Sequence, residues 1–281
     1  MSIPLEDLFN DVIGKARRGL GMTEDALSAR SGVPVADIKC AMKGEVDEIV
    51  LLKLALALGL DGSSLVALAQ RSWAPRPVMM EGLAQFNTEW DDMTVNAYIV
   101  YDPQTKVAAA FDTGATAQPM VDFIKAKGLS LNLVFLTHTH PDHIADLTGL
   151  CEAGAPVVFV NEREPVSGAK TFQVGDTTGW ELGCLRIEPR DTHGHSKGGT
   201  TYVITGLAQP VAVVGDALFS SSMGGGVVSF LDALATNRKE IFTLPDETIV
   251  CPGHGPLTTI GEEKAHNPFY PEFKISFTPQ P

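Results

Sequence analysis

Three histidines and one aspartate are crowded into six consecutive positions, directly after the apolar run at residues 131–136. An apolar run of that length with polar residues on both sides predicts a buried strand, so these side chains are expected just past a strand end. Imidazole nitrogen and carboxylate oxygen are ligands that zinc and iron(II) accept. The sequence therefore predicts a metal-binding loop made by His138, His140, Asp142 and His143.

The rest of the chain repeats this arrangement. None of the seven histidines lies before position 138, and His195 and His254 each occupy a glycine-flanked loop. The apolar run at residues 211–214 ends in Gly215-Asp216, which places another carboxylate past a strand end. One such histidine alone would be assigned to an ordinary surface or core position, but the joint pattern needs a common cause. We therefore expect a single metal centre built at successive strand ends.

The order His-x-His-x-Asp-His, followed by single His, Asp and His positions, resembles the metallo-β-lactamase-fold hydrolases over residues 84–281. The resemblance implies an α/β fold, a four-layer αββα sandwich with two divalent metal ions at one edge of its sheets. Zinc is the expected metal, with iron and manganese as alternatives. One ion would be held by His138, His140 and His195, the other by Asp142, His143 and His254, with Asp216 bridging them. The resemblance also implies that Asp112 supports the site.

Two bridged metal ions would lower the pKa of a water from about 16 towards 7 and so make a hydroxide nucleophile. Asp142 is the expected catalytic residue, because it can also hold or pass the proton. A small thioester or ester with an easily expelled leaving group suits this chemistry. The segment from Pro252 to Phe269 resembles glyoxalase II-related hydrolases, but only 27 residues follow His254. A long basic extension for glutathione is therefore not expected, which disfavours a glutathione thioester.

Three alternatives stay open on the sequence. The similar persulfide dioxygenases use one iron ion, which here would take His138, His195 and Asp216. A transcriptional regulator whose hydrolase-like domain senses a metal or small molecule is a second alternative. Lactonase and β-lactamase activities form the third.

Residues 1–74 are a different kind of sequence and predict a small all-α domain, with helices at 5–18, 24–30, 34–42 and 48–59. Thr23 is the expected N-cap of the second helix, and the last helix, apolar all round, is expected at the centre of the bundle. The order Thr-Glu-x-x-Leu-x-x-x-Ser-Gly-Val resembles the Cro/repressor-like helix-turn-helix family, whose third helix enters the major groove. Residues 75–83 are the expected linker to the catalytic domain at 84–281.

DNA binding is nevertheless disfavoured. The third helix offers no Arg, Asn or Gln for base edges, and residues 1–74 carry 8 Lys and Arg against 10 Asp and Glu, a net charge of −2. The helical domain is instead expected to make a homo-oligomer or to pack on the catalytic domain.

The whole chain carries a formal net charge of −13, which argues against binding to nucleic acid or to an anionic membrane. No apolar run reaches the roughly 18 residues of a membrane helix, and the N-terminus has no basic-then-apolar leader. The four cysteines form no Cys-x-x-Cys pair. These features predict a cytoplasmic protein that acts on a small molecule. The glycine-rich segment 222–226 is expected to be a mobile loop beside the site.

Overall fold

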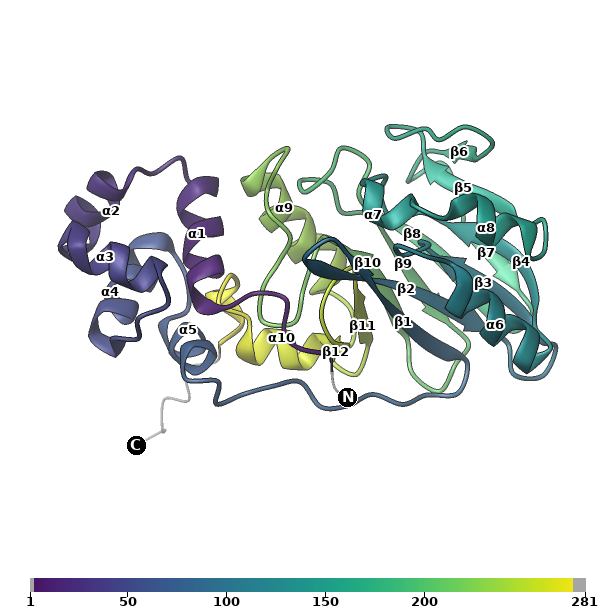
Figure 1. The fold of residues 1–281 in the computed structure, drawn as a ribbon, viewed down its shortest axis with the longest axis horizontal. Coiled ribbons are helices and arrows are strands. Elements are labelled where there is room, and N and C mark those ends of the chain that lie inside the picture. The colour runs from purple at the N-terminus through teal and green to yellow at the C-terminus, as the bar shows by residue number, and fades with distance from the viewer. Residues whose placement is uncertain (1–2, 275–281) are drawn as a thin grey trace.

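The computed structural model describes residues 3–274 and begins with a bundle of helices (Figure 1). These are α1 (Phe9–Gly19), α2 (Glu24–Ser31), α3 (Val35–Met42), α4 (Glu48–Leu58) and α5 (Gly62–Ala69). The hydroxyl of Thr23 accepts a 3.1 Å hydrogen bond from the backbone N–H of Ala26, which confirms the expected N-cap of α2. Three residues join α2 to α3, and the helix-turn-helix resemblance of this pair stays a prediction.

Two six-stranded sheets follow the bundle. The first sheet has the order β1 (Leu83–Trp90), β2 (Met93–Tyr101), β3 (Val107–Phe111), β4 (Ser130–Phe135), β5 (Val157–Asn161) and β6 (Lys170–Phe172). Helices α6 (Gln118–Lys127), α7 (Pro141–Ile144) and α8 (Leu147–Glu152) lie between its strands in sequence. The first and third of these helices contribute residues to the apolar cluster on one face of the sheet.

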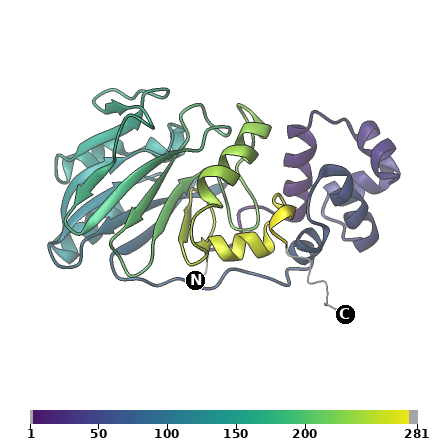
Figure 2. The same cartoon turned by 180° about the vertical axis from the view of Figure 1, so that it is seen from behind.

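The second sheet has the order β12 (Thr258–Thr259), β11 (Ile249–Pro252), β10 (Val211–Gly215), β9 (Thr200–Thr205), β8 (Leu185–Asp191) and β7 (Trp180–Leu182). Helix α9 (Phe230–Thr236) continues into a π-helical turn (Asn237–Ile241), and α10 (Ile260–His266) is followed by a 3₁₀ turn (Pro271–Phe273). Seen from behind, α9 and α10 lie between this sheet and the helical bundle (Figure 2).

Alternate side chains of the central strands belong to different apolar layers, because successive side chains of a strand point to opposite faces of the sheet. In β10, Val211 and Val213 belong to the apolar cluster between the sheets, whereas Ala212 and Val214 belong to the cluster on the outer face. The two sheets flanked by helices are the α/β sandwich expected from the sequence.

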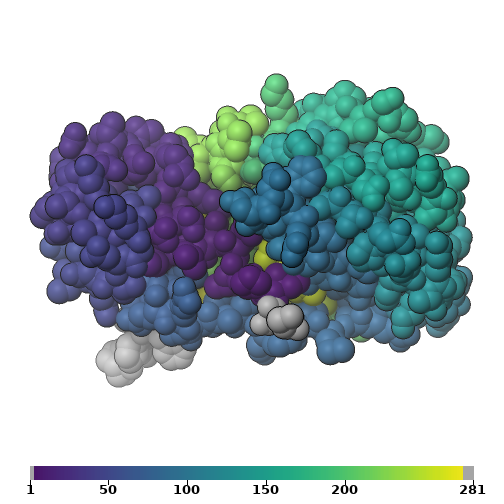
Figure 3. Space-filling model, viewed as in Figure 1, coloured from purple at the N-terminus to yellow at the C-terminus, as the bar shows by residue number. Residues whose placement is uncertain are grey.

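The outer cluster of the second sheet extends without a break into the helical bundle. It contains Ala212 and Val250 of the sheet, Phe230 of α9, and Ile13 and Leu54 of the bundle. The space-filling view shows the purple N-terminal part lying directly against the blue and green surfaces of the sandwich (Figure 3). The bundle and the sandwich therefore share one hydrophobic core.

Helix α4 differs from expectation, because it is not buried all round. Leu51 and Leu54 point into the core, but Ile49 is 68% exposed and Leu56 is 83% exposed. The helix packs on α1, α2, α3 and α5 from one side, which leaves an apolar stripe on the other.

Local features set several element boundaries. Helices α7 and α8 are separated at Asp146, whose carboxylate accepts the backbone N–H of Ala117 ahead of α6. Strands β7 and β8 form a tight hairpin that turns at Gly183, with φ 62°. Strand β1 starts at Leu83, the last residue of the expected linker, and its mostly half-buried side chains form no apolar run that would have predicted it. The short β12 follows β11 and pairs with it in antiparallel fashion.

None of the helices within residues 3–274 is long and apolar enough to cross a membrane.

Candidate metal centre

The predicted ligands stand at one edge of the sandwich because of strand direction. Strand β3 runs parallel to β4 in the first sheet, and β10 runs parallel to β11 in the second, so within each pair the carboxyl ends lie side by side. Strand β8 has the same direction as β10, because β9 is antiparallel to both. The segments that follow β4, β8, β10 and β11 carry the seven candidates: His138, His140, Asp142, His143, His195, Asp216 and His254.

The structure brings four of these side chains into a first group: His138, His140, His195 and Asp216. Nδ1 of His140 lies 3.1 Å from Nε2 of His138 and 3.0 Å from Nε2 of His195. Nε2 of His195 is also 3.3 Å from Oδ2 of Asp216. Four potential ligand atoms thus face a common point.

The other three candidates form a second group: Asp142, His143 and His254. Nε2 of His254 lies 3.4 Å from Oδ2 of Asp142 and 3.5 Å from Oδ2 of Asp216. Nε2 of His143 lies 3.3 Å from Oδ1 of Asp216. The carboxylate of Asp216 therefore borders both groups, in the position that a bridging ligand requires.

The donor atoms fit divalent metal ions. A tetrahedral ion with nitrogen and oxygen ligands at about 2.0–2.1 Å separates neighbouring ligand atoms by roughly 3.3 Å, close to the distances in the first group. Nε2 of His143 and Oδ1 of Asp216 are buried and have no hydrogen-bond partner among the described residues. Burying a polar atom without a partner destabilises the folded state, and a cation between these two atoms would supply the missing interaction.

Each of three histidines is oriented through its second ring nitrogen. Nδ1 of His143 donates to Oδ2 of Asp112 at 2.9 Å, and Nδ1 of His254 donates to the carbonyl of Thr94 at 2.7 Å. Nδ1 of His195 donates to the carbonyl of Gly225 at 2.8 Å. These bonds keep the proton on Nδ1, so that Nε2 is the nitrogen each ring can offer to a metal ion, as is usual for metal-binding histidines.

Asp112 ties two ligand-bearing segments together. Its Oδ1 accepts the backbone N–H of Thr137 and its Oδ2 accepts the hydroxyl of the same residue, each at 2.7 Å. The backbone of Asp112 has φ 56°, a left-handed conformation that aspartate and asparagine tolerate better than most residues. The location of Asp112 agrees with its predicted supporting role.

Charge and burial act differently on four histidines of the site. Burial and the neighbouring imidazoles lower the pKa of His138 and His195. Burial is the largest single influence and opposes a charge on His143 and His254, but Asp216, together with Asp112 beside His143 and Asp142 beside His254, raises their pKa values to about 10 and about 11. The same two imidazoles hold the pKa of Asp216 well below its usual range despite its burial. A metal ion at the second group would take the place of those protons.

Glu164 belongs to the site and was not predicted. Its Oε2 accepts the backbone N–H of Thr139 at 2.8 Å, and its Oε1 accepts the backbone N–H of Gly198 at 2.8 Å. Although burial opposes ionisation, these donors lower the pKa of Glu164. The carboxylate therefore joins the loop of His138 and His140 to the loop of His195.

Two glycines allow the backbone to approach the centre closely. A Cβ atom on Gly224 would lie 1.9 Å from the carbonyl oxygen of Asp216, and one on Gly253 would lie 2.1 Å from Oδ1 of the same residue. Gly224 belongs to the glycine-rich segment, which lies beside the site as expected. Its mobility stays a prediction.

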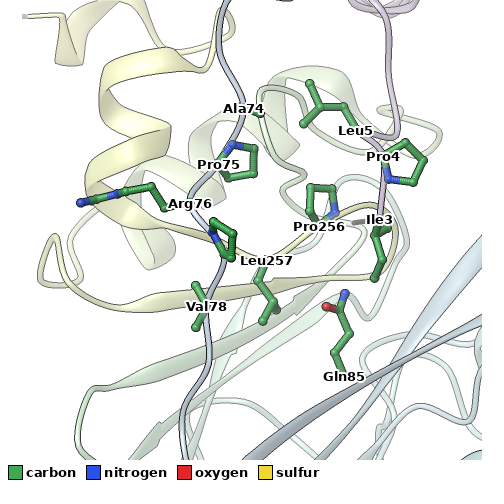
Figure 4. Close-up of a pocket in the computed structure, with 11 residues that line it drawn as sticks. Ile3, Pro4, Leu5, Ala74, Pro75, Arg76, Val78, Gln85, Pro256 and Leu257 are labelled. Atoms are coloured by element: carbon green, nitrogen blue, oxygen red, sulfur yellow. The ribbon is translucent and has the colours of Figure 1, made fainter. Parts of the chain in front are cut away.

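The remaining histidines lie outside both groups. Nδ1 of His193 bonds to Asp191, and the ring of His266 stacks on Trp73 at 4.3 Å. Cys251 is buried in the apolar cluster between the sheets, so it is a core residue. A cavity of about 370 Å³ lies between the N-terminal segment, the linker and Leu257 (Figure 4). None of its lining residues is a ligand candidate.

Known proteins resemble this chain in sequence and in fold. The sequence profile of the metallo-beta-lactamase superfamily matches residues 90–254. A probable metallo-hydrolase of Streptococcus pyogenes is 33% identical over 206 residues, which cover 62% of this chain and 85% of that protein. A hydroxyacylglutathione hydrolase of Albidiferax ferrireducens is 32% identical over 143 residues, or 49% of this chain and 54% of that enzyme. The crystal structure of ETHE1 from Myxococcus xanthus has a TM-score of 0.58 and 27% identity, and the match covers 67% of this chain and 85% of that one.

The chain belongs to the metallo-beta-lactamase superfamily. This confirms the family expected from the sequence and supports an enzyme of the hydrolase class. The fold and the two ligand groups together imply binding of divalent metal ions. Residues 1–89 lie outside the matched range.

Proposed function

We propose that this protein is a binuclear metallo-hydrolase that cleaves a small thioester or ester. The observation that carries the proposal is the position of Asp216, whose two carboxylate oxygens face His195 at 3.3 Å and His143 at 3.3 Å in different ligand groups. A site for one ion would not need His143, His254 and Asp142 as a second convergent group. Zinc is the proposed metal, because three imidazoles and a carboxylate form a tetrahedral set that it accepts.

When bound, two divalent cations would lower the pKa of a water and polarise a substrate carbonyl. Asp142 is the residue of this chain that would transfer the proton in the reaction. Burial opposes its ionisation, but the nearby His254 and His143 lower its pKa, so it is a carboxylate at neutral pH. Asp142 is only partly buried and can therefore accept a proton from the attacking water and return it to the leaving thiolate or alkoxide.

The similarity to a hydroxyacylglutathione hydrolase supports a thioester as the substrate class. Because this chain spans about half the length of that enzyme, the similarity supports the bond that is cleaved rather than the particular thiol. A thioester also has a better leaving group than an amide, so it needs less assistance from the protein.

A mononuclear iron persulfide dioxygenase is the second candidate. It is favoured by one observation, that the three ligands it would use, His138, His195 and Asp216, all belong to the first group. This candidate gives the second group no part in catalysis.

The two candidates differ in what they consume. Protein of known metal content is assayed for thiol release from a thioester panel and, in parallel, for oxygen uptake with a glutathione persulfide. We expect thiol release without oxygen uptake, and we expect Asp142→Ala and His140→Ala each to lower kcat by about 100-fold or more. Oxygen uptake without thioester turnover would overturn the hydrolase and select the dioxygenase.

A further inference from the structure

The segment Phe219–Gly226 lies between the metal centre and the helical bundle. Two residues separate it from Asp216, and it includes the glycine-rich residues. Much of it is buried, including Ser222 and Met223. We call this segment the bridging loop.

The inner side of the bridging loop contacts one histidine of each ligand group. The carbonyl of Gly225 accepts the 2.8 Å hydrogen bond that orients His195. The ring of Phe219 meets the imidazole of His254 edge-on, with 5.6 Å between the ring centroids. A shift of this loop would therefore change the orientation of ligands in both groups.

The outer side of the bridging loop is held by the start of the chain. Nζ of Lys15, on α1, donates to the carbonyl of Met223 at 2.9 Å and lies over the ring of Phe219, 4.9 Å from its centroid. Asp7, just before α1, accepts the hydroxyl of Ser222 and pairs with Lys15. Both charged side chains are largely buried, with 15% of Lys15 and 8% of Asp7 exposed.

Burying an ion pair is costly unless its remaining donors and acceptors are used. Here those remaining bonds are made to the bridging loop, because Lys15 donates to the carbonyl of Met223 and Asp7 accepts the hydroxyl of Ser222. Removing one partner would leave an uncompensated buried charge against the loop. The pair is thus placed to transmit the position of α1 to the metal centre.

We propose that Lys15 and Asp7 are positioning residues for the metal centre, so that the helical bundle is a working part of the catalytic unit. Neither residue touches a ligand candidate directly; they act through the carbonyl of Gly225 and the ring of Phe219. This inference rests on the proposed function for its activity readout. Its metal-binding readout does not depend on any substrate.

The test compares Lys15→Met with Lys15→Arg in the full-length protein. Methionine keeps the apolar packing on Phe219 but removes the charge and the donors, whereas arginine keeps both. The measurements are zinc affinity by chelator competition, the visible spectrum of the cobalt(II)-substituted protein, and kcat and KM for thioester hydrolysis. The double variant Asp7→Asn, Lys15→Met removes the pair without leaving a buried charge.

Two controls separate positioning from general stability. Lys53→Met removes an exposed lysine from α4 and is expected to change none of these measurements. Leu54→Ala opens a cavity in the core of the bundle, and it should lower the melting temperature while leaving the cobalt spectrum unchanged.

We expect Lys15→Met and the double variant to weaken zinc affinity by about 10-fold, the low end for outer partners of metal ligands, and to alter the cobalt spectrum. Lys15→Arg should retain the zinc affinity and the cobalt spectrum of the wild type. Wild-type affinity and spectrum in both Lys15→Met and the double variant would overturn the proposal. The proposal would also be overturned if Leu54→Ala, at an equal loss of stability, weakened zinc affinity and altered the cobalt spectrum as much as Lys15→Met does. If the parent hydrolyses no thioester but the affinity and spectrum change as expected, the proposed substrate fails and this inference stands.

Discussion

Oδ2 of Asp112 accepts a 2.9 Å hydrogen bond from Nδ1 of His143, and the same oxygen accepts the hydroxyl of Thr137. One carboxylate thus orients a ligand of the second group and anchors the start of the loop that carries the first. The dependence of both groups on this residue leads to the first prediction.

Asp112→Asn is expected to weaken metal affinity by about 10- to 100-fold, because the amide loses the charge that holds the tautomer of His143. Asparagine tolerates the positive φ of this position, so the variant should stay folded. Chelator competition gives the affinity, and nitrogen NMR of the imidazoles reports the tautomer. An unchanged affinity would show that Asp112 only anchors the loop.

Glu164→Gln should loosen the contact between the two ligand-bearing loops. Glutamine keeps only one acceptor oxygen, so it cannot accept from Thr139 and Gly198 through two separate oxygens as the carboxylate does. We expect a stability loss of about 1–3 kcal/mol and faster amide exchange at Gly198. Urea unfolding and hydrogen exchange measure these effects. Equal exchange in the variant and the wild type would contradict the assigned role.

The ligand candidates could be predicted because metal-binding side chains have a restricted chemistry and stand at recognisable strand ends. His138, Asp216 and His254 each follow an apolar run or a glycine-flanked turn, and parallel strands bring those ends together. The two-sheet sandwich could be predicted for a related reason, since its central strands are continuous apolar runs.

The outer layer of the site could not be predicted. Two histidines are oriented by backbone carbonyls, those of Thr94 and Gly225, and a carbonyl leaves no mark on residue type. Glu164 sits in an ordinary charged stretch, and its partners lie 25 and 34 positions away. Helix α4 was misjudged because apolar composition alone does not tell how many neighbours will cover a helix.

Glu263 is expected to make the stability of the protein depend on pH. It is fully buried, accepts the backbone N–H of Ser221, and lies near Lys274 and Tyr270; burial raises its pKa to about 7. Because the folded pKa lies above the unfolded value of about 4.5, the folded state binds more protons between these pH values. The contribution of Glu263 to stability is therefore full below about pH 4.5 and falls as the pH rises through about 7.

Glu263→Gln should remove this fall, on the order of a few kcal/mol between pH 5 and pH 8. Denaturant unfolding at both pH values measures the difference between the variant and the wild type. Glu247→Gln, at an exposed position, is the matched control and should follow the wild type. A variant whose pH slope equals that of the wild type would show that Glu263 is ionised alike in both states.

The last prediction concerns metal stoichiometry. We expect the purified protein to bind about two divalent ions per chain, because two convergent ligand groups share Asp216. His254→Ala removes a ligand of the second group and should leave about one ion bound. His193→Ala, at a histidine that pairs with Asp191 outside both groups, is the control and should keep two. Elemental analysis after dialysis against excess zinc measures the ratio. A single equivalent in the wild type that His254→Ala does not change would establish a mononuclear centre and favour the iron-dependent alternative.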